Sequence, residues 1–158
     1  MTVTIRALDV TTDMADWRRM RFTLWPHYNE PDMEIEIRDV LATIDRQPVY
    51  VAVVPDGSLC GLMETNIRPW AEGCATDRVG YLEAWYVDPA WRRYGIGRRL
   101  VEAAEAWARA QGCTEMASDT DDGYPISPQA HGRLGYIVVK TAPNEICFAK
   151  RLVPEPPQ

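Results

Sequence analysis

The segment Trp85–Leu100 constrains the fold of this chain more than any other part of it. An apolar strand is followed there by a turn that contains Gly95 and Gly97, and then by the start of an amphipathic helix. Glycine allows a backbone to approach an anion closely because it has no Cβ, and the first N–H groups of a helix lie unpaired at the positive end of its dipole. The segment therefore predicts a pyrophosphate-binding turn. A tight strand-to-helix turn without a ligand is the alternative, because two glycines at this spacing occur in many unrelated loops.

The residues around the two glycines extend this pattern. The spacing Arg92-x-x-Gly95-x-Gly97, reached directly from a strand and followed by one apolar helical face, resembles the acetyl-CoA-binding motif of the GNAT superfamily of N-acetyltransferases. Segments 79–83, 103–109 and 117–120, and the spacing His131-x-x-Leu134-Gly135 near the end, resemble the bacterial aminoglycoside 6'-N-acetyltransferases of type I. The likeness covers most of the chain, which is identified on these residues as a member of the superfamily.

Periodicity along the chain predicts a mixed α/β fold. Strands are expected near 4–8, 49–54, 59–67, 79–87, 115–118, 136–140 and 146–152, and helices near 14–24, 33–44, 96–111 and 125–134. This order agrees with the GNAT fold, a mixed and mostly antiparallel sheet flanked by helices. The resemblance implies that the fourth and fifth strands splay apart, with residues 85–87 on one side of a slot for the pantetheine arm and residues 117–119 on the other.

Length and composition predict one acetyltransferase domain over residues 1–152 and a disordered Pro-rich tail over 153–158, since 158 residues suffice for one sizeable core. Apolar runs fall far short of the ~20 residues of a membrane-spanning helix, so we expect a cytoplasmic protein with no membrane partner. A formal net charge of −6 disfavours nucleic acid and favours a cationic partner. The cysteines are scattered and histidines are few, so no metal site is indicated.

The resemblance also implies which residues bind the cosubstrate, acetyl-CoA. They lie at the end of the fourth strand, in the glycine turn, and at a position where the family usually has asparagine and this chain has tyrosine. The set is Trp85, Tyr86, Val87, Arg92, Arg93, Tyr94, Gly95, Ile96, Gly97, Arg98 and Tyr124. Backbone N–H groups near Val87 are expected to stabilise charge that develops on the reacting carbonyl oxygen.

Two carboxylates are the candidates for amine chemistry. Glu83 stands among apolar neighbours in the fourth strand, which places its carboxylate on a partly buried face, and Asp119 ends the fifth strand. In the resembled family, the matching residues bind the acceptor's amines, and a carboxylate that gathers an ammonium group can also take its proton. An ordinary ion pair at the edge of the sheet is the alternative for Glu83.

His131 is the third catalytic candidate. Many GNAT enzymes have a tyrosine at the matching place that acts as a general acid toward the sulfur, and a histidine titrates near neutrality. A packing and hydrogen-bonding role is the alternative. Acetyl transfer from a thioester to an amine requires no covalent nucleophile, and Cys113 and Cys147 fall outside the expected slot, so we expect direct transfer without an acyl-enzyme.

Trp25 and Trp70 are the remaining substrate-binding candidates, because the family lines its sugar cleft with aromatic side chains at these places. The alternative is that each is an ordinary, partly buried tryptophan without a role in binding. The chain departs from the family near Lys140, where an acidic residue is expected. In the family that acidic residue reaches across a dimer interface, so the homodimer implied by the resemblance has an altered shared cleft here.

These residues together favour an acetyl-CoA-dependent enzyme that modifies the 6'-amino group of aminoglycoside antibiotics and so causes resistance. A GNAT acetyltransferase for polyamines or protein N-termini is the enzymatic alternative. A non-catalytic module that binds acyl-CoA is the alternative of another class, and the presence of both Glu83 and Asp119 speaks against it.

Overall fold

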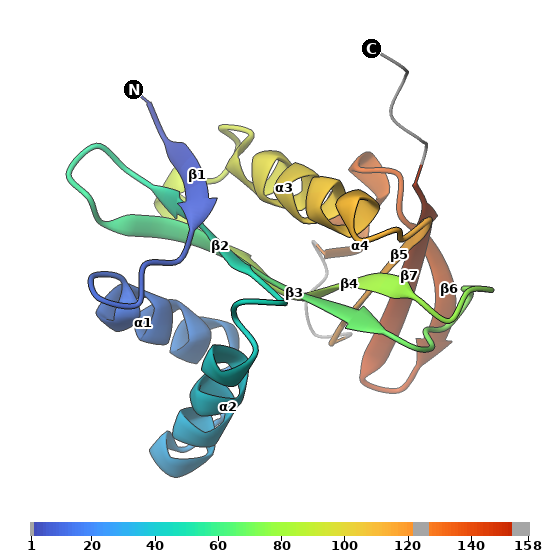
Figure 1. Ribbon diagram of the computed structural model, residues 1–158, viewed down its shortest axis with the longest axis horizontal. Helices are drawn as coiled ribbons and strands as arrows, with labels where there is room; N and C mark the ends of the chain where they lie inside the picture. The colour runs from blue at the N-terminus through green and yellow to red at the C-terminus, as the bar shows by residue number, and fades with distance from the viewer. Residues whose placement is uncertain (1, 122–126, 153–158) are drawn as a thin grey trace. The chain divides into compact units, whose positions relative to one another are not determined.

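The structure, a computed structural model, describes residues 2–121 and 127–152. These residues form α-helices, β-strands and a short 3-10 helix, η1 (Figure 1). The bounds are β1 Thr4–Ala7, α1 Met14–Leu24, α2 Glu30–Ala42, β2 Val49–Val53, β3 Leu59–Arg68, β4 Val79–Val87, η1 Pro89–Trp91, α3 Ile96–Ala110, β5 Glu115–Thr120, α4 Ser127–Arg133, β6 Ile137–Ala142 and β7 Glu145–Arg151.

The strands form one sheet in the order β1-β2-β3-β4-β5-β7-β6. The ladders β1–β2, β2–β3, β5–β7 and β6–β7 are antiparallel, whereas β4 and β5 are parallel. The parallel ladder joins Gly80–Leu82 to Met116–Ser118, while β4 itself continues to Val87. The predicted α/β class with a mostly antiparallel sheet is therefore confirmed.

Local signals explain most of the element boundaries. The second helix begins earlier than expected, at Glu30, because the side chain of Asn29 caps it by accepting a hydrogen bond from the N–H of Asp32 at 2.9 Å. The helix expected near 96–111 ends as predicted, since Gly112 follows it with φ +87°. The fifth strand is longer than expected and includes Asp119 and Thr120.

The chain divides into two compact units, each built from two stretches. The first takes its residues from Met1–Thr65 and Ala84–Ala103, and the second from Asn66–Glu83 and Ala104–Gln158. The strands β3 and β4 and the helix α3 each run from one unit into the other. The single domain expected over residues 1–152 stays a prediction, and the tail expected over 153–158 lies outside the described residues.

The first unit packs α1 and α2 against the strands through apolar side chains. Trp17, Met20 and Met33 are fully buried there beside Val51 and Leu62. The other face of the same strands receives α3, because a Cβ at Gly61 would lie 3.1 Å from the Leu100 side chain. In Figure 1, α1 and α2 accordingly lie across these strands from the start of α3.

The core of the first unit also contains an ion pair. Arg21 and Glu64 are 2% and 4% exposed, and the Arg21 guanidinium Nη1 lies 2.6 Å from both Glu64 carboxylate oxygens. The indole N–H of Trp17 donates to the same carboxylate at 2.9 Å. These hydrogen bonds compensate the desolvation of the two charges and tie α1 to β3.

The second unit has its own core around β4 and β5. Val79, Tyr81, Ala71 and Ala117 form a buried cluster. Gly80 leaves no space for a side chain, because a Cβ there would lie 2.8 Å from the Ala108 Cβ of α3. This close approach presses α3 onto β4 at the level where β4 begins its ladder with β5.

Candidate active site

The glycine turn lies in the first unit, between η1 and α3. Arg93 and Gly95 have φ values of +71° and +77°, and α3 begins directly afterwards at Ile96. A Cβ at Gly95 would have no atom within 4 Å, so the space beside this backbone is open. A left-handed residue that faces open space immediately before a 15-residue helix is the arrangement in which backbone N–H groups bind an anion.

Gly97 is required for a different reason. The indole N–H of Trp85, from β4, donates to the carbonyl oxygen of Gly97 at 3.2 Å, and a Cβ at Gly97 would lie 3.3 Å from the indole ring. The absence of a side chain thus allows Trp85 to pack on the first turn of α3. This contact fixes the turn to the strand that precedes it.

The other predicted cofactor residues differ in what they can offer. Arg92 is anchored, because its Nε donates to the carbonyl oxygen of Val87 at 2.8 Å and its guanidinium lies 5.8 Å from the Tyr86 ring centroid. Ile96 is 2% exposed, so its side chain is not available to a ligand. By contrast, Tyr94 is 73% exposed, and Arg93 and Arg98 are exposed as well. Tyr124 lies outside the described residues.

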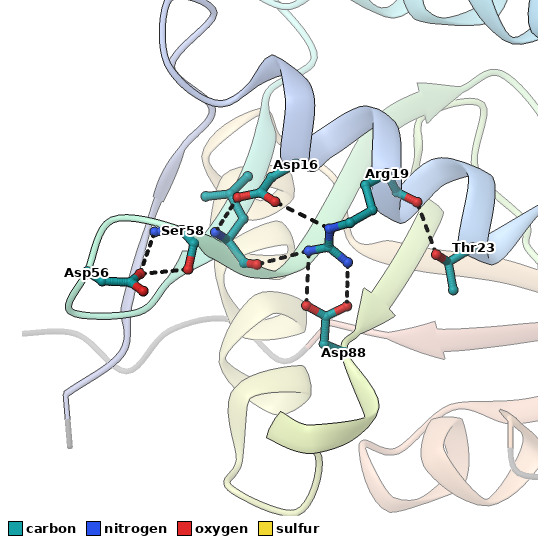
Figure 2. A network of polar contacts seen from close by, with 7 residues as sticks. Asp16, Arg19, Thr23, Asp56, Ser58 and Asp88 are labelled. Carbon is teal, nitrogen blue, oxygen red and sulfur yellow. Dashed lines mark hydrogen bonds and ion pairs between the residues drawn. The ribbon is translucent and has the colours of Figure 1, made fainter.

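A polar network holds the segment that leads into the turn (Figure 2). Asp88 directly follows β4, and both of its carboxylate oxygens accept hydrogen bonds from Arg19 of α1, at 3.0 and 3.1 Å. The same guanidinium donates to the carbonyl oxygen of Leu59 at 3.2 Å and to Asp16 at 3.3 Å. Because Asp88 begins the turn, this network sets where the turn starts relative to α1 and β3.

The two predicted carboxylates, Glu83 and Asp119, belong to one connected group in the second unit. Glu83 accepts hydrogen bonds from Arg68 Nη2 at 2.7 Å, Arg68 Nε at 2.8 Å and the Asn66 side-chain amide at 3.0 Å. Hydrogen bonding to Glu83 raises the pKa of Arg68 further. The charge on Glu83 is therefore compensated by a bidentate ion pair.

Asp119 joins this group through a tyrosine. The Tyr81 hydroxyl donates to Asp119 Oδ2, and the Arg68 guanidinium lies over the Tyr81 ring with Cζ 3.5 Å from the ring centroid. Burial and the neighbouring Asp119 raise the pKa of Tyr81 well above its ordinary value, so the phenol remains a donor. Asp119 itself is exposed, whereas Tyr81 is 5% exposed.

His131 follows Asp119 by 12 positions in the sequence and is buried in the interior of the second unit. It is 3% exposed and stacks on Phe148 with ring centroids 3.9 Å apart. Its Nδ1 lies 2.8 Å from the Ser127 carbonyl oxygen, which only accepts, so Nδ1 carries the proton and Nε2 accepts from the Ser118 hydroxyl at 2.9 Å. Burial lowers the pKa of His131, which keeps the ring neutral at physiological pH.

The remaining candidates are aromatic residues and a lysine. Trp25, in the first unit, is half-buried and has the Arg21 guanidinium 4.8 Å from its ring centroid. Trp70, in the second unit, is 64% exposed in the loop between β3 and β4. Lys140, where the family's acidic residue is missing, forms ion pairs with Glu72 at 3.2 Å and Glu145 at 3.6 Å.

Sequence reasoning did not identify the partners of the two carboxylates. Asn66 and Arg68 share one face of a strand, as do Tyr81 and Glu83, and this alternation was a usable signal. The register between the strands, which brings Arg68 to Glu83, cannot be read from alternation alone. The contact between Arg19 and Asp88 joins residues 69 positions apart and left no local signal.

Comparison with known proteins agrees with this geometry. The model of the acetyltransferase (GNAT) family matches residues 11–136. The chain belongs to the GNAT family of acetyltransferases. Among its relatives is an aminoglycoside N(6')-acetyltransferase type 1 of Klebsiella aerogenes, 44% identical over 90% of this chain and 93% of that protein. Another of the same description, from Stenotrophomonas maltophilia, is 39% identical over 78% of this chain and 80% of that protein.

Solved structures of aminoglycoside acetyltransferases resemble this GNAT protein closely. The enzyme AAC(6')-Iy, in complex with a bisubstrate analogue of CoA and acetylneamine, has a TM-score of 0.80 and 29% identity over 90% of this chain and 95% of that chain. AAC(6')-Ih of Acinetobacter baumannii has a TM-score of 0.79 and 29% identity over 89% of this chain and 95% of that chain. The predicted GNAT fold is confirmed. The homodimer and the cytoplasmic location stay predictions.

The residues of the turn fit the coenzyme that the family uses. Acetyl-CoA carries a pyrophosphate, and the turn offers an open backbone at Gly95, the first N–H groups of α3 and the exposed side chains of Arg93 and Arg98. Within residues 2–121 and 127–152, no group of His, Cys, Asp and Glu side chains is arranged to hold a metal ion, and no helix has the length and apolar content needed to span a bilayer.

Proposed function

We propose that this GNAT protein transfers the acetyl group of acetyl-CoA to the 6'-amino group of an aminoglycoside, and that the loss of that positive charge causes antibiotic resistance. The observation that carries the proposal is the pair of carboxylates, Glu83 and Asp119, gathered in the second unit with Arg68 and Tyr81. Two acidic groups in one cluster suit an acceptor with several ammonium groups. The names of the relatives support the same class of acceptor.

The acceptor arrives as an ammonium ion and must become a neutral amine before it can react. Glu83 and Asp119 are the groups that would bind the ammonium and take its proton, directly or through water. Tyr81 leaves Asp119 with one oxygen, Oδ1, available for an acceptor N–H, because the tyrosine hydroxyl engages Oδ2. We assign Asp119 the more direct role, since its side chain is exposed.

The first unit would hold the coenzyme. Arg93, Gly95 and Arg98, together with the first N–H groups of α3, would bind the pyrophosphate, and Trp85 would keep the turn attached to β4 through its contact with Gly97. Acetyl-CoA, when bound, supplies an acetyl group activated as a thioester. The backbone near Val87 would stabilise charge on the reacting carbonyl oxygen.

His131 would act in this scheme through Ser118. Its neutral ring has no proton on Nε2, and its Nδ1 proton is held by the Ser127 carbonyl oxygen, so neither nitrogen is set to protonate a leaving thiolate in this state. We therefore favour the hydrogen-bonding role, in which His131 fixes Ser118, the neighbour of Asp119 in β5. The general-acid role stays a prediction, and unchanged turnover in His131→Ala would exclude it.

The cysteines support direct transfer without an acyl-enzyme. Burial raises the pKa of the thiols of Cys60, Cys74 and Cys147 to about 11 and also raises that of Cys113. Such thiols are protonated at neutral pH and are poor nucleophiles. Cys113→Ala and Cys147→Ala are expected to keep the turnover of the wild type.

The proposal is tested by following thiol release from acetyl-CoA in the presence of kanamycin, tobramycin or sisomicin. We expect release with each compound and a loss of about 100-fold or more in kcat/KM for Asp119→Asn, since general base catalysis is worth roughly 10²–10⁴-fold. The affinity for acetyl-CoA should be unchanged in that variant. Absence of turnover with every 6'-amino compound would refute the assignment.

A further inference from the structure

The carboxylate cluster of the second unit already contains a cation. The guanidinium of Arg68 binds both oxygens of Glu83 and stacks on the ring of Tyr81, whose hydroxyl binds Asp119. Both carboxylates contribute to the raised pKa of Arg68, with Glu83 the larger cause. The group thus has two negative charges and one positive charge, which pairs with Glu83 and lies over the tyrosine that binds Asp119.

We propose that Arg68 is a resident counter-ion that an ammonium group of the acceptor displaces from Glu83. Competition from Arg68 then limits the affinity of the protein for cationic acceptors. This inference rests on the proposed function and deepens it, because it names the residue that limits acceptor binding at the same site. Binding at Glu83 is then an exchange of one cation for another rather than the simple pairing of opposite charges.

The hydrogen bonds of Glu83 favour such an exchange. Its oxygens accept from Arg68 twice and from Asn66 once, at 2.7–3.0 Å. An ammonium group that approached without displacing a donor would meet a carboxylate whose charge is compensated and whose acceptor sites are largely filled. The acceptor gains a strong contact only when the guanidinium moves away.

The exposure of the pair makes the exchange feasible. The side chains of Arg68 and Glu83 are 38% and 26% exposed, so water and a polar ligand can reach both groups. Breaking an ion pair of this exposure costs far less than breaking a fully buried pair, because water can solvate both separated charges. Arg68 is long and flexible, and its released head group can be hydrated at the surface.

The alternative is that Arg68 holds Glu83 in the orientation needed for binding. The two roles predict opposite changes in acceptor affinity when the guanidinium is removed. A displaced counter-ion competes with the acceptor, so Arg68→Gln should increase acceptor affinity. A positioning residue keeps Glu83 in the orientation that binds the acceptor, so the same substitution should decrease acceptor affinity.

The test is isothermal titration of kanamycin and of acetyl-CoA into the wild type and three variants. Arg68→Gln is expected to lower the Kd of kanamycin about fivefold, the upper end of the range for a partly exposed ion pair, and to steepen its dependence on salt. Arg68→Lys keeps the charge, so its kanamycin Kd should lie between those of the wild type and Arg68→Gln. The Kd of acetyl-CoA should be unchanged throughout.

The matched control is Arg78→Gln. Arg78 lies in the same unit, immediately before β4, and donates to the carbonyl oxygen of Gln111 at 2.9 Å. Its substitution changes the net charge equally but at the start of β4, five residues from Glu83, so it should leave the kanamycin Kd within about twofold, given a Debye length of about 8 Å.

The outcomes separate the inference from the function on which it rests. Tighter binding in Arg68→Gln, with unchanged binding in Arg78→Gln, supports the displaced counter-ion. Weaker or equal binding in Arg68→Gln, while the wild type binds and acetylates kanamycin, overturns the inference alone. A wild type that binds acetyl-CoA but neither binds nor acetylates aminoglycosides overturns the proposed function and the inference with it.

Discussion

Gly95→Ala separates the conformational role of the glycine turn from its binding role. Gly95 has φ +77°, where an L-residue with a Cβ is strained by about 1–2 kcal/mol. The reduced freedom of the unfolded alanine chain offsets part of that strain, by about 0.4–1 kcal/mol. The net loss of folding stability should therefore be about 1 kcal/mol, with no steric clash, because no atom lies within 4 Å of the added Cβ.

The effect on the coenzyme should be larger. The added methyl group would enter the open space beside the backbone where we place the pyrophosphate, and a lost hydrogen bond to a charged group is worth about 1.5–3 kcal/mol. This corresponds to a loss in acetyl-CoA affinity of roughly 10- to 150-fold. The assay is isothermal titration of acetyl-CoA, with urea unfolding to measure stability.

Gly57→Ala is the matched control in the same unit. Gly57 lies in the turn between β2 and β3 with φ +92°, and a Cβ there would also have no atom within 4 Å. Both variants should lose similar stability, but Gly57→Ala should keep the acetyl-CoA Kd of the wild type. The reasoning fails if Gly95→Ala binds acetyl-CoA within about twofold of the wild type, or if both variants weaken it equally.

Three other predictions concern the surroundings of the site. Arg19→Ala removes the bidentate contact to Asp88 that leads into the turn, so the KM for acetyl-CoA should rise about three- to tenfold with little change in kcat; a drop in kcat alone would contradict a positioning role. Glu64→Gln leaves the buried charge of Arg21 poorly compensated and should cost about 3 kcal/mol in urea unfolding, whereas a loss below about 1 kcal/mol would show that the pair is dispensable. Because burial lowers the pKa of His131, its neutral form stabilises the fold fully above pH ~6.5, and this contribution is lost as the pH falls below that value. The Tm of the wild type should thus fall more steeply from pH 7 to pH 5 than that of His131→Gln, and parallel curves would refute the linkage.

Local sequence signals were sufficient for most of the fold. The strand, glycine turn and helix of segment 85–100, the hairpin turn at Gly57 and the helix end at Gly112 all depend on backbone preferences of a few neighbouring residues. Apolar periodicity places the start of the second helix too late, because it begins at Met33 whereas Asn29 supplies the cap. Capping chemistry decides a helix end before the apolar face becomes visible.

The candidate site was less accessible from the sequence. Glu83 and Asp119 could be named through family resemblance, yet their chemistry depends on Arg68 and Tyr81, which contact them across strands. Burial likewise decides the protonation state of His131. The ring is enclosed against Phe148, and this lowers its pKa, which the ordinary pKa of a histidine does not reveal. Register and burial arise from the packing of distant segments, and neither is a property of the local sequence.

The most direct test of the account compares neomycin with paromomycin, which differ by an amine or a hydroxyl at the 6' position. Each is incubated with the wild type and acetyl-CoA, and the product is analysed by mass spectrometry and NMR. We expect neomycin to be acetylated once, on the 6' nitrogen, and paromomycin to remain unmodified. Unmodified neomycin, or equal acetylation of both compounds, would contradict the assignment of this protein as a 6'-N-acetyltransferase.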